Sequence, residues 1–110
     1  MGKKCYGLLR VLGMKTLRKI PVTLVQVEYI PKELEDNTIY LSAEYSIAVH
    51  KCLCGCGELA AMPLNIKGET DGWNYSIDAQ ERVTFTPSVL NTHCPNRYHY
   101  IITNGIANVV

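Results

Sequence analysis

The chain has 110 residues, of which 47% are hydrophobic and 19% charged, and these values are typical of one globular domain. They exclude a disordered tail, and no run approaches the roughly 18 apolar residues that a membrane-spanning helix needs. A domain of this size buries only about two-thirds of the surface of its unfolded chain, so a bound metal ion would help to stabilise it.

The formal net charge of +1 is unevenly distributed along the chain. Residues 1–19 contain six basic residues and no acidic residue, whereas the remainder has five basic and ten acidic residues, a net charge of −5. We interpret residues 1–19 as a basic N-terminal extension with a weak helical pattern, and residues 20–110 as a single domain. Only one aromatic residue, Tyr6, accompanies the basic residues, which disfavours nucleic-acid binding.

Two features bear on the location of the protein. The apolar run from Tyr6 to Leu9 is interrupted by Arg10 and no small-residue cleavage site follows, so a secretory signal peptide is not indicated. The number of cysteines, five, is odd and fits a disulfide framework poorly. We therefore expect a cytoplasmic protein, in which disulfides are rare.

The domain has the pattern of a series of short β-strands. Val25, Val27 and Tyr29 alternate with polar residues, as in a half-buried strand, and residues 31–37 resemble a turn. Pro63 places the strand that contains it at an edge or a terminus. The expected strands cover residues 25–29, 38–41, 45–52, 59–64, 73–77, 83–85, 98–103 and 106–110.

Local signals predict two hairpins among these strands. Residues 73–77 and 83–85 both alternate and are separated by a short polar turn, so they are expected to pair. Asn104-Gly105 tolerates the positive φ angles of a type I′ turn and predicts a C-terminal hairpin. The expected fold class is therefore mainly β, a small antiparallel β domain.

Residues that bind metal ions are concentrated in two short segments. All three histidines and four of the five cysteines lie within residues 50–56 and 93–99. Thiolate and imidazole are the ligands that zinc prefers, and structural zinc sites draw them in close pairs from separate segments. We predict a Zn²⁺ site that joins the central Cys-Gly segment to the C-terminal hairpin. The predicted ligands come from His50, Cys52, Cys54, Cys56, Cys94 and His99.

The Cys-x-Cys spacing requires a bend in the backbone. Residues two apart on an extended strand are separated by about 6.6 Å, whereas two sulfurs on one tetrahedral zinc ion lie about 3.8 Å apart. Gly55 and Gly57 supply the conformational freedom for this bend and let backbone N–H groups turn toward the thiolates.

The two segments offer seven donors, whereas one tetrahedral ion needs four. The preferred ligand set is two of the three cysteines in residues 52–56 together with Cys94 and His99. For His50 and His93, a role in orienting a ligand or in packing the core is an equally good interpretation. Catalysis by a reactive cysteine paired with a histidine is conceivable, but a metal ion explains the cluster better.

A catalytic zinc ion also needs an open coordination position and a carboxylate to transfer protons. If residues 44–52 form one strand, Glu44 shares a face with His50 and Cys52. Glu44 is therefore the candidate catalytic residue, and the alternative is an ordinary solvated strand residue. The high thiolate content of the site favours a structural ion.

Several short motifs together resemble a family of small bacterial and phage proteins long labelled as of unknown function. The resemblance covers Val27 to the C-terminus. It is carried by Glu44-Tyr45, His50-x-Cys52-x-Cys54-Gly55-Cys56-Gly57, Pro63-Leu64, Trp73, Thr86-Pro87-Ser88, Cys94, His99-Tyr100 and Asn104-Gly105. Members of that family are found beside bacterial ubiquitin-like conjugation genes, and a metal-dependent peptidase role is suggested for some of them.

Two functional hypotheses follow from the residues and the resemblance. The first is a zinc-dependent peptidase or isopeptidase that acts on a ubiquitin-like modifier, with Glu44 moving the proton. The second is a non-enzymatic adaptor, in which a closed zinc site stiffens a β-sheet surface that binds the modifier or a conjugation enzyme.

Overall fold

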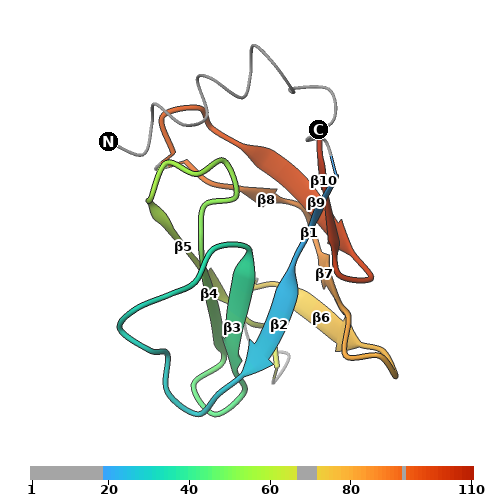
Figure 1. Cartoon of the computed structure of the whole chain (residues 1–110). Coiled ribbons are helices and arrows are strands. Elements are labelled where there is room, and N and C mark those ends of the chain that lie inside the picture. Colours follow the sequence, from blue (N-terminus) through green and yellow to red (C-terminus); the bar gives the residue numbers. More distant parts are fainter. Residues whose placement is uncertain (1–18, 67–71, 93) are drawn as a thin grey trace.

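The structure is a computed structural model that describes residues 19–66, 72–92 and 94–110 (Figure 1). Most of the predicted N-terminal extension, Cys5 and His93 lie outside these residues. The described part is an all-β fold, which confirms the predicted fold class, and none of its segments is a helix long and apolar enough to cross a membrane.

Within the described residues, ten strands form two four-stranded sheets and one two-stranded sheet. In chain order they are β1 (Lys19–Pro21), β2 (Thr23–Gln26), β3 (Thr38–Ser42), β4 (Ile47–Lys51), β5 (Leu59–Pro63), β6 (Asn74–Ile77), β7 (Val83–Thr86), β8 (Val89–Leu90), β9 (His99–Thr103) and β10 (Ile106–Val109). The strand orders are β1-β10-β9-β8, β2-β3-β4-β5 and β6-β7.

Both predicted hairpins are present. Strands β6 and β7 pair antiparallel with Tyr75 opposite Phe85. Strands β9 and β10 are joined at Asn104 and Gly105, whose φ angles of 50° and 76° are both positive, as a type I′ turn requires. Local turn chemistry therefore fixes these two pairings.

Three details of the fold differ from the sequence prediction. Strand β2 pairs with β3 in parallel, although the other strand pairs among the described residues are antiparallel. Strand β2 also ends at Gln26, because β3 ends at Ser42, whose hydroxyl donates a hydrogen bond of 2.7 Å to the Glu28 carbonyl instead of extending the ladder. The short strand β8 had no sequence signal of its own, since it contains only Val89 and Leu90.

The strand predicted at residues 45–52 is shorter than expected, so the condition that residues 44–52 form one strand is not met. Residues 43–46 form the β3–β4 turn, in which Ser46 has a φ of 55° and the Tyr45 N–H donates to the Ser42 hydroxyl oxygen at 3.2 Å. A positive φ interrupts the extended backbone, so strand β4 begins only at Ile47.

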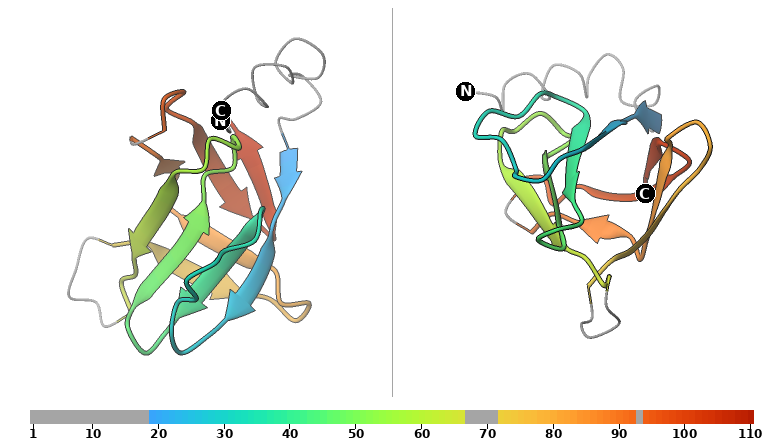
Figure 2. Two further views of the ribbon diagram at one scale, coloured as in Figure 1. Left: turned by 60° about the vertical axis from the view of Figure 1, so that its left-hand side comes forward. Right: turned by 90° about the horizontal axis from the view of Figure 1, so that it is seen from below.

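The core lies between the two four-stranded sheets, whose arrangement is visible in Figure 2. Its largest fully buried side chains include Ile39, Met62, Phe85 and Tyr100. At one end of this core, the loop after β4 approaches the loop between β8 and β9 (Figure 1). Both loops carry cysteines, so the two sheets meet there through thiols.

Candidate functional site

Four thiols gather where the two loops meet. Cys52, Cys54 and Cys56 come from the loop after β4, and Cys94 comes from the loop between β8 and β9. All four are buried, and their Sγ atoms lie within 4.8 Å of one another. The Sγ atoms of Cys52 and Cys54 are 3.5 Å apart, and those of Cys54 and Cys94 are 3.1 Å apart. These two separations are shorter than the spacing of about 3.8 Å expected around a tetrahedral ion, and that spacing lies within the 4.8 Å limit that holds for all four sulfurs.

The predicted bend in the cysteine loop occurs at the predicted glycines. Gly55 and Gly57 have φ angles of 89° and 90°, a region that other residues rarely adopt. The Gly55 N–H donates to the Cys52 carbonyl at 3.1 Å, which closes the turn. On the other loop, the Asn96 N–H donates to the Cys94 sulfur at 3.4 Å. The backbone therefore folds around the sulfur atoms.

The thiols titrate differently from free cysteine. Burial raises the pKa of Cys52 to about 11, and burial followed by contact with Cys94 raises the pKa of Cys54 further. For Cys94, burial opposes ionisation, but the backbone N–H of Tyr98, the Cys54 thiol and the Asn96 N–H lower its pKa to about 7. Several thiolates this close repel one another, and a metal cation would remove that repulsion. The donor set thus fits a metal ion.

His50 lies in the core rather than among the thiols. It is fully buried on β4, and its Nε2 atom lies 2.5 Å from the hydroxyl oxygen of Tyr100 on β9. Burial lowers the pKa of His50 to about 4, so the ring is neutral at pH 7. His50 therefore joins the two sheets across the core, which is the packing role that the sequence left open for it.

His99 also has a different partner from the predicted one. Its Nε2 atom lies 2.7 Å from the Oγ atom of Ser88. Strands β8 and β9 pair Val89 with Tyr100 and Leu90 with His99, and Val89 and Tyr100 are buried. Since side chains alternate along a strand, Leu90, His99 and Ser88 project from the opposite, outer face.

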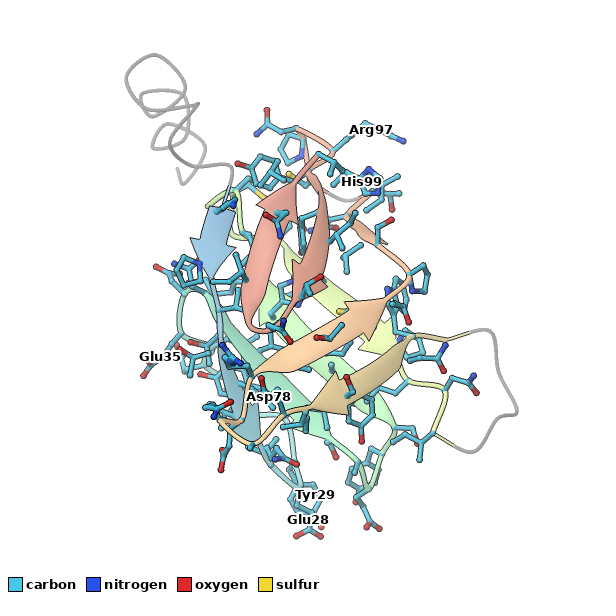
Figure 3. All side chains as sticks on the ribbon, turned by 90° about the vertical axis from the view of Figure 1, so that its right-hand side faces the viewer. Glu28, Tyr29, Glu35, Asp78, Arg97 and His99 are labelled. Carbon is cyan, nitrogen blue, oxygen red and sulfur yellow. The ribbon has the colours of Figure 1, made fainter. Side chains whose placement is uncertain are left out.

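The Ser88–His99 pair is held in place yet open to solvent. Ser88 and His99 are both only half-buried, and Figure 3 shows His99 at the end of the molecule that also carries Arg97. The Trp73 Nε1–H donates to the Ser88 carbonyl oxygen at 3.3 Å, which anchors the backbone beside the hydroxyl. A serine hydroxyl within hydrogen-bonding distance of an imidazole nitrogen is the arrangement of a nucleophile and its general base.

Ser88 did not stand out in the sequence as a candidate nucleophile. It lies in Thr86-Pro87-Ser88, which contributed only to the family resemblance, and it has no G-x-S-x-G context. The sequence did contain one indication of this pair: Thr86-Pro87-Ser88 and His99-Tyr100 are both among the motifs that carry the family resemblance.

Glu44 is remote from both groups of residues. It lies in the exposed β3–β4 turn, at the opposite end of β4 from Cys52. Its neighbour Tyr45 packs against Tyr29, with ring centroids 5.5 Å apart, and Figure 3 shows Tyr29 and His99 at opposite ends of the molecule. Glu44 is therefore not positioned to exchange a proton at the thiol cluster.

Comparison with protein families agrees with the predicted resemblance. The family model described as bacterial ubiquitination-like system serine protease (BubE) matches residues 26–110. The chain belongs to the BubE family. The predicted link to bacterial ubiquitin-like conjugation is confirmed, whereas the BubE description names a serine protease rather than a metal-dependent one. No curated protein and no solved structure matches the chain.

Proposed function

We propose that the protein is a serine protease that cleaves a ubiquitin-like modifier of a bacterial conjugation system, with Ser88 as the nucleophile and His99 as the general base. The observation that carries this proposal is the 2.7 Å contact between the Ser88 Oγ and His99 Nε2 atoms. The serine protease description of the BubE family supports it independently.

The pair can perform both halves of an acyl transfer. The Ser88 hydroxyl donates its proton to His99 Nε2 while Oγ attacks the scissile carbonyl carbon, and the imidazolium then returns that proton to the departing amine. A water molecule hydrolyses the resulting ester, with His99 taking a proton from the water and giving one back to Ser88. Because β9 holds His99 and Trp73 anchors Ser88, little motion is needed before attack.

We further propose that the four cysteines hold a structural zinc ion. Four thiolates would fill the tetrahedral positions that zinc prefers. Cys94 lies five residues before His99, so an ion shared with the loop after β4 would fix the start of β9 and thereby the base. The ion would supply stability to the site, and Ser88 and His99 would supply the chemistry.

The zinc-peptidase hypothesis has less support than the serine mechanism. It needs an open coordination position and a nearby carboxylate. Glu44 lies at the far end of β4, and the four thiols suffice for a closed site. The adaptor hypothesis agrees with the closed site but leaves the Ser88–His99 contact without a role.

The decisive experiment compares single variants on a modifier extended at its C-terminus. Ser88→Ala should lower the rate of cleavage by at least about 10³-fold, because the nucleophile is removed. Ser76→Ala, at an exposed serine of β6, and Glu44→Gln should both cleave at the wild-type rate. Metal content and melting temperature should be the same in all four proteins.

The outcomes separate the three functions. A fluorophosphonate should label wild-type protein on Ser88 and should not label Ser88→Ala. Full cleavage by Ser88→Ala combined with loss in Glu44→Gln would replace the serine mechanism by the zinc-peptidase mechanism. Binding of the modifier without cleavage or labelling of the wild type would favour the adaptor.

A further inference from the structure

The two four-stranded sheets each end in an edge strand that lines a common pocket, and one of these strands, β8, directly follows Ser88. Strand β5 is the last strand of one sheet and β8 is the last strand of the other. At the C-terminal end of β5 the Pro63 carbonyl accepts a hydrogen bond of 2.8 Å from the Trp73 N–H, and no strand of the described ranges pairs with the rest of either edge. Between them lies a pocket of about 360 Å³, lined by residues 59–62, Trp73 and residues 89–92. Figure 1 labels both strands that line this gap.

The hydrogen-bond register of β5 shows which backbone groups point into the gap. The Cys52 N–H donates to the Glu58 carbonyl and the Leu64 N–H donates to the Ser46 carbonyl, so even-numbered residues of β5 bond to β4. The backbone N–H and C=O groups of Ala61 therefore point away from β4. The same holds for Leu59.

The hydrogen-bond register of β8 shows that this strand also has backbone groups that point away from its own sheet. The Asn91 N–H donates to the Tyr98 carbonyl, and Val89 pairs with Tyr100, so these residues bond to β9. The N–H and C=O groups of Leu90 consequently point away from β9, toward the pocket. Two open edges thus offer backbone donors and acceptors to the same space.

The chemistry of the gap indicates an apolar, extended occupant. Its lining residues carry no charge, and Leu59 and Leu90 remain 52% and 43% exposed at its margins. Soluble proteins usually protect open strand edges with lysine, proline or a covering element. Strand β8 contains neither lysine nor proline, and β5 has a proline only at its last residue, Pro63. A pocket at the small end of the range for ligand sites accommodates one or two side chains rather than a folded domain.

We propose that the substrate binds as an added β-strand between β5 and β8, with an apolar side chain in the pocket against Met62 and Trp73. This inference rests on the proposed serine protease function. Ser88 directly precedes β8, two residues from Leu90, so a segment paired with Leu90 brings a neighbouring peptide bond to the Ser88 hydroxyl. The protease should therefore prefer substrates in which the cleaved bond lies in a flexible segment, with an apolar residue within about three positions of that bond.

The test removes one backbone donor from the gap without disturbing the sheet. In Ala61→Pro the lost N–H is the outward one, so the β4–β5 ladder remains intact. The kcat/KM for the extended modifier should fall about tenfold, as expected for one hydrogen bond and added bulk. Replacing the apolar residues next to the cleaved bond by aspartate should cause a similar fall in wild-type protein.

Gln26→Pro is the matched control. Gln26 lies on β2, whose odd-numbered residues bond to β3, so its N–H also points away from its sheet, but at an edge formed by a different strand. This variant should cleave at the wild-type rate.

A small fluorophosphonate separates this inference from the proposed function, because it needs no strand pairing. Ala61→Pro should be labelled as fast as wild type. If wild type is not labelled, the serine mechanism fails. If labelling is normal but Ala61→Pro cleaves as fast as wild type, the added strand is wrong. A wild-type dimer that Ala61→Pro converts to monomers without slower cleavage would likewise overturn it and assign the edge to self-association.

Discussion

The thiol cluster and the Ser88–His99 pair share one stretch of chain, since Cys94 lies between Ser88 and His99, yet they differ in almost every physical respect. The cluster is buried, comes from two loops and has a donor set suited to a closed metal site. The pair is half-buried and lies on β9 and directly before β8, the strand whose residues line the pocket between the two sheet edges. Under the proposed function, the most conspicuous chemical motif of this small domain serves its stability, while the less conspicuous Ser88–His99 pair serves the chemistry.

Loss of one thiol should have the largest effect, and it should act on the fold. In Cys54→Ser the remaining three cysteines cannot complete a tetrahedral site, so we expect loss of stoichiometric metal and a melting temperature lower by more than about 10 °C. Elemental analysis and thermal unfolding measure both quantities. Cys5→Ser, at a position outside the described residues, is expected to change neither.

The same variant also tests the division of roles. At low temperature, the extent of fluorophosphonate labelling of Cys54→Ser should equal the fraction of the variant that is folded, because Ser88 and His99 are unchanged. Complete loss of labelling in a fully folded variant would mean that the metal takes part in the chemistry itself.

Loss of the Tyr100 hydroxyl should have an intermediate effect. Tyr100→Phe leaves the buried Nε2 atom of His50 without its partner, which should cost about 1–3 kcal/mol of unfolding free energy. Denaturant unfolding provides the measurement, and metal content should remain stoichiometric. Tyr75→Phe, at a half-buried position on β6, should cost much less. If Tyr100→Phe and Tyr75→Phe lose the same unfolding free energy, the His50–Tyr100 contact does not stabilise the fold.

Adding one methyl group at Gly55 should have the smallest effect. A Cβ atom there meets no atom within 4 Å, so only the φ of 89° opposes it, and we expect a cost of about 1 kcal/mol. Glu58→Ala, at a neighbouring exposed position, is the control. If Gly55→Ala is as stable as that control and binds metal as tightly, the bend does not depend on glycine.

Sequence alone was a good guide where the determining residues are close together. Three of the four clustered thiols lie within five residues, and the C-terminal hairpin depends on the dipeptide Asn104-Gly105. Both features are set by local chemistry and short-range geometry, so their existence could be read without knowing the fold. The family membership followed in the same way, from motifs that keep their order along the chain.

The tertiary structure alone decided which partner each histidine takes. His99 lies five residues from Cys94 yet meets Ser88, because the pairing of β8 with β9 turns both side chains to the outer face. His50 lies two residues from Cys52 yet points into the core toward Tyr100. Strand β4 ends at Lys51, so Cys52 already belongs to the turn of the cysteine loop, whereas His50 keeps the orientation of the strand. Which face of a strand is buried depends on sheet packing that no local spacing reveals.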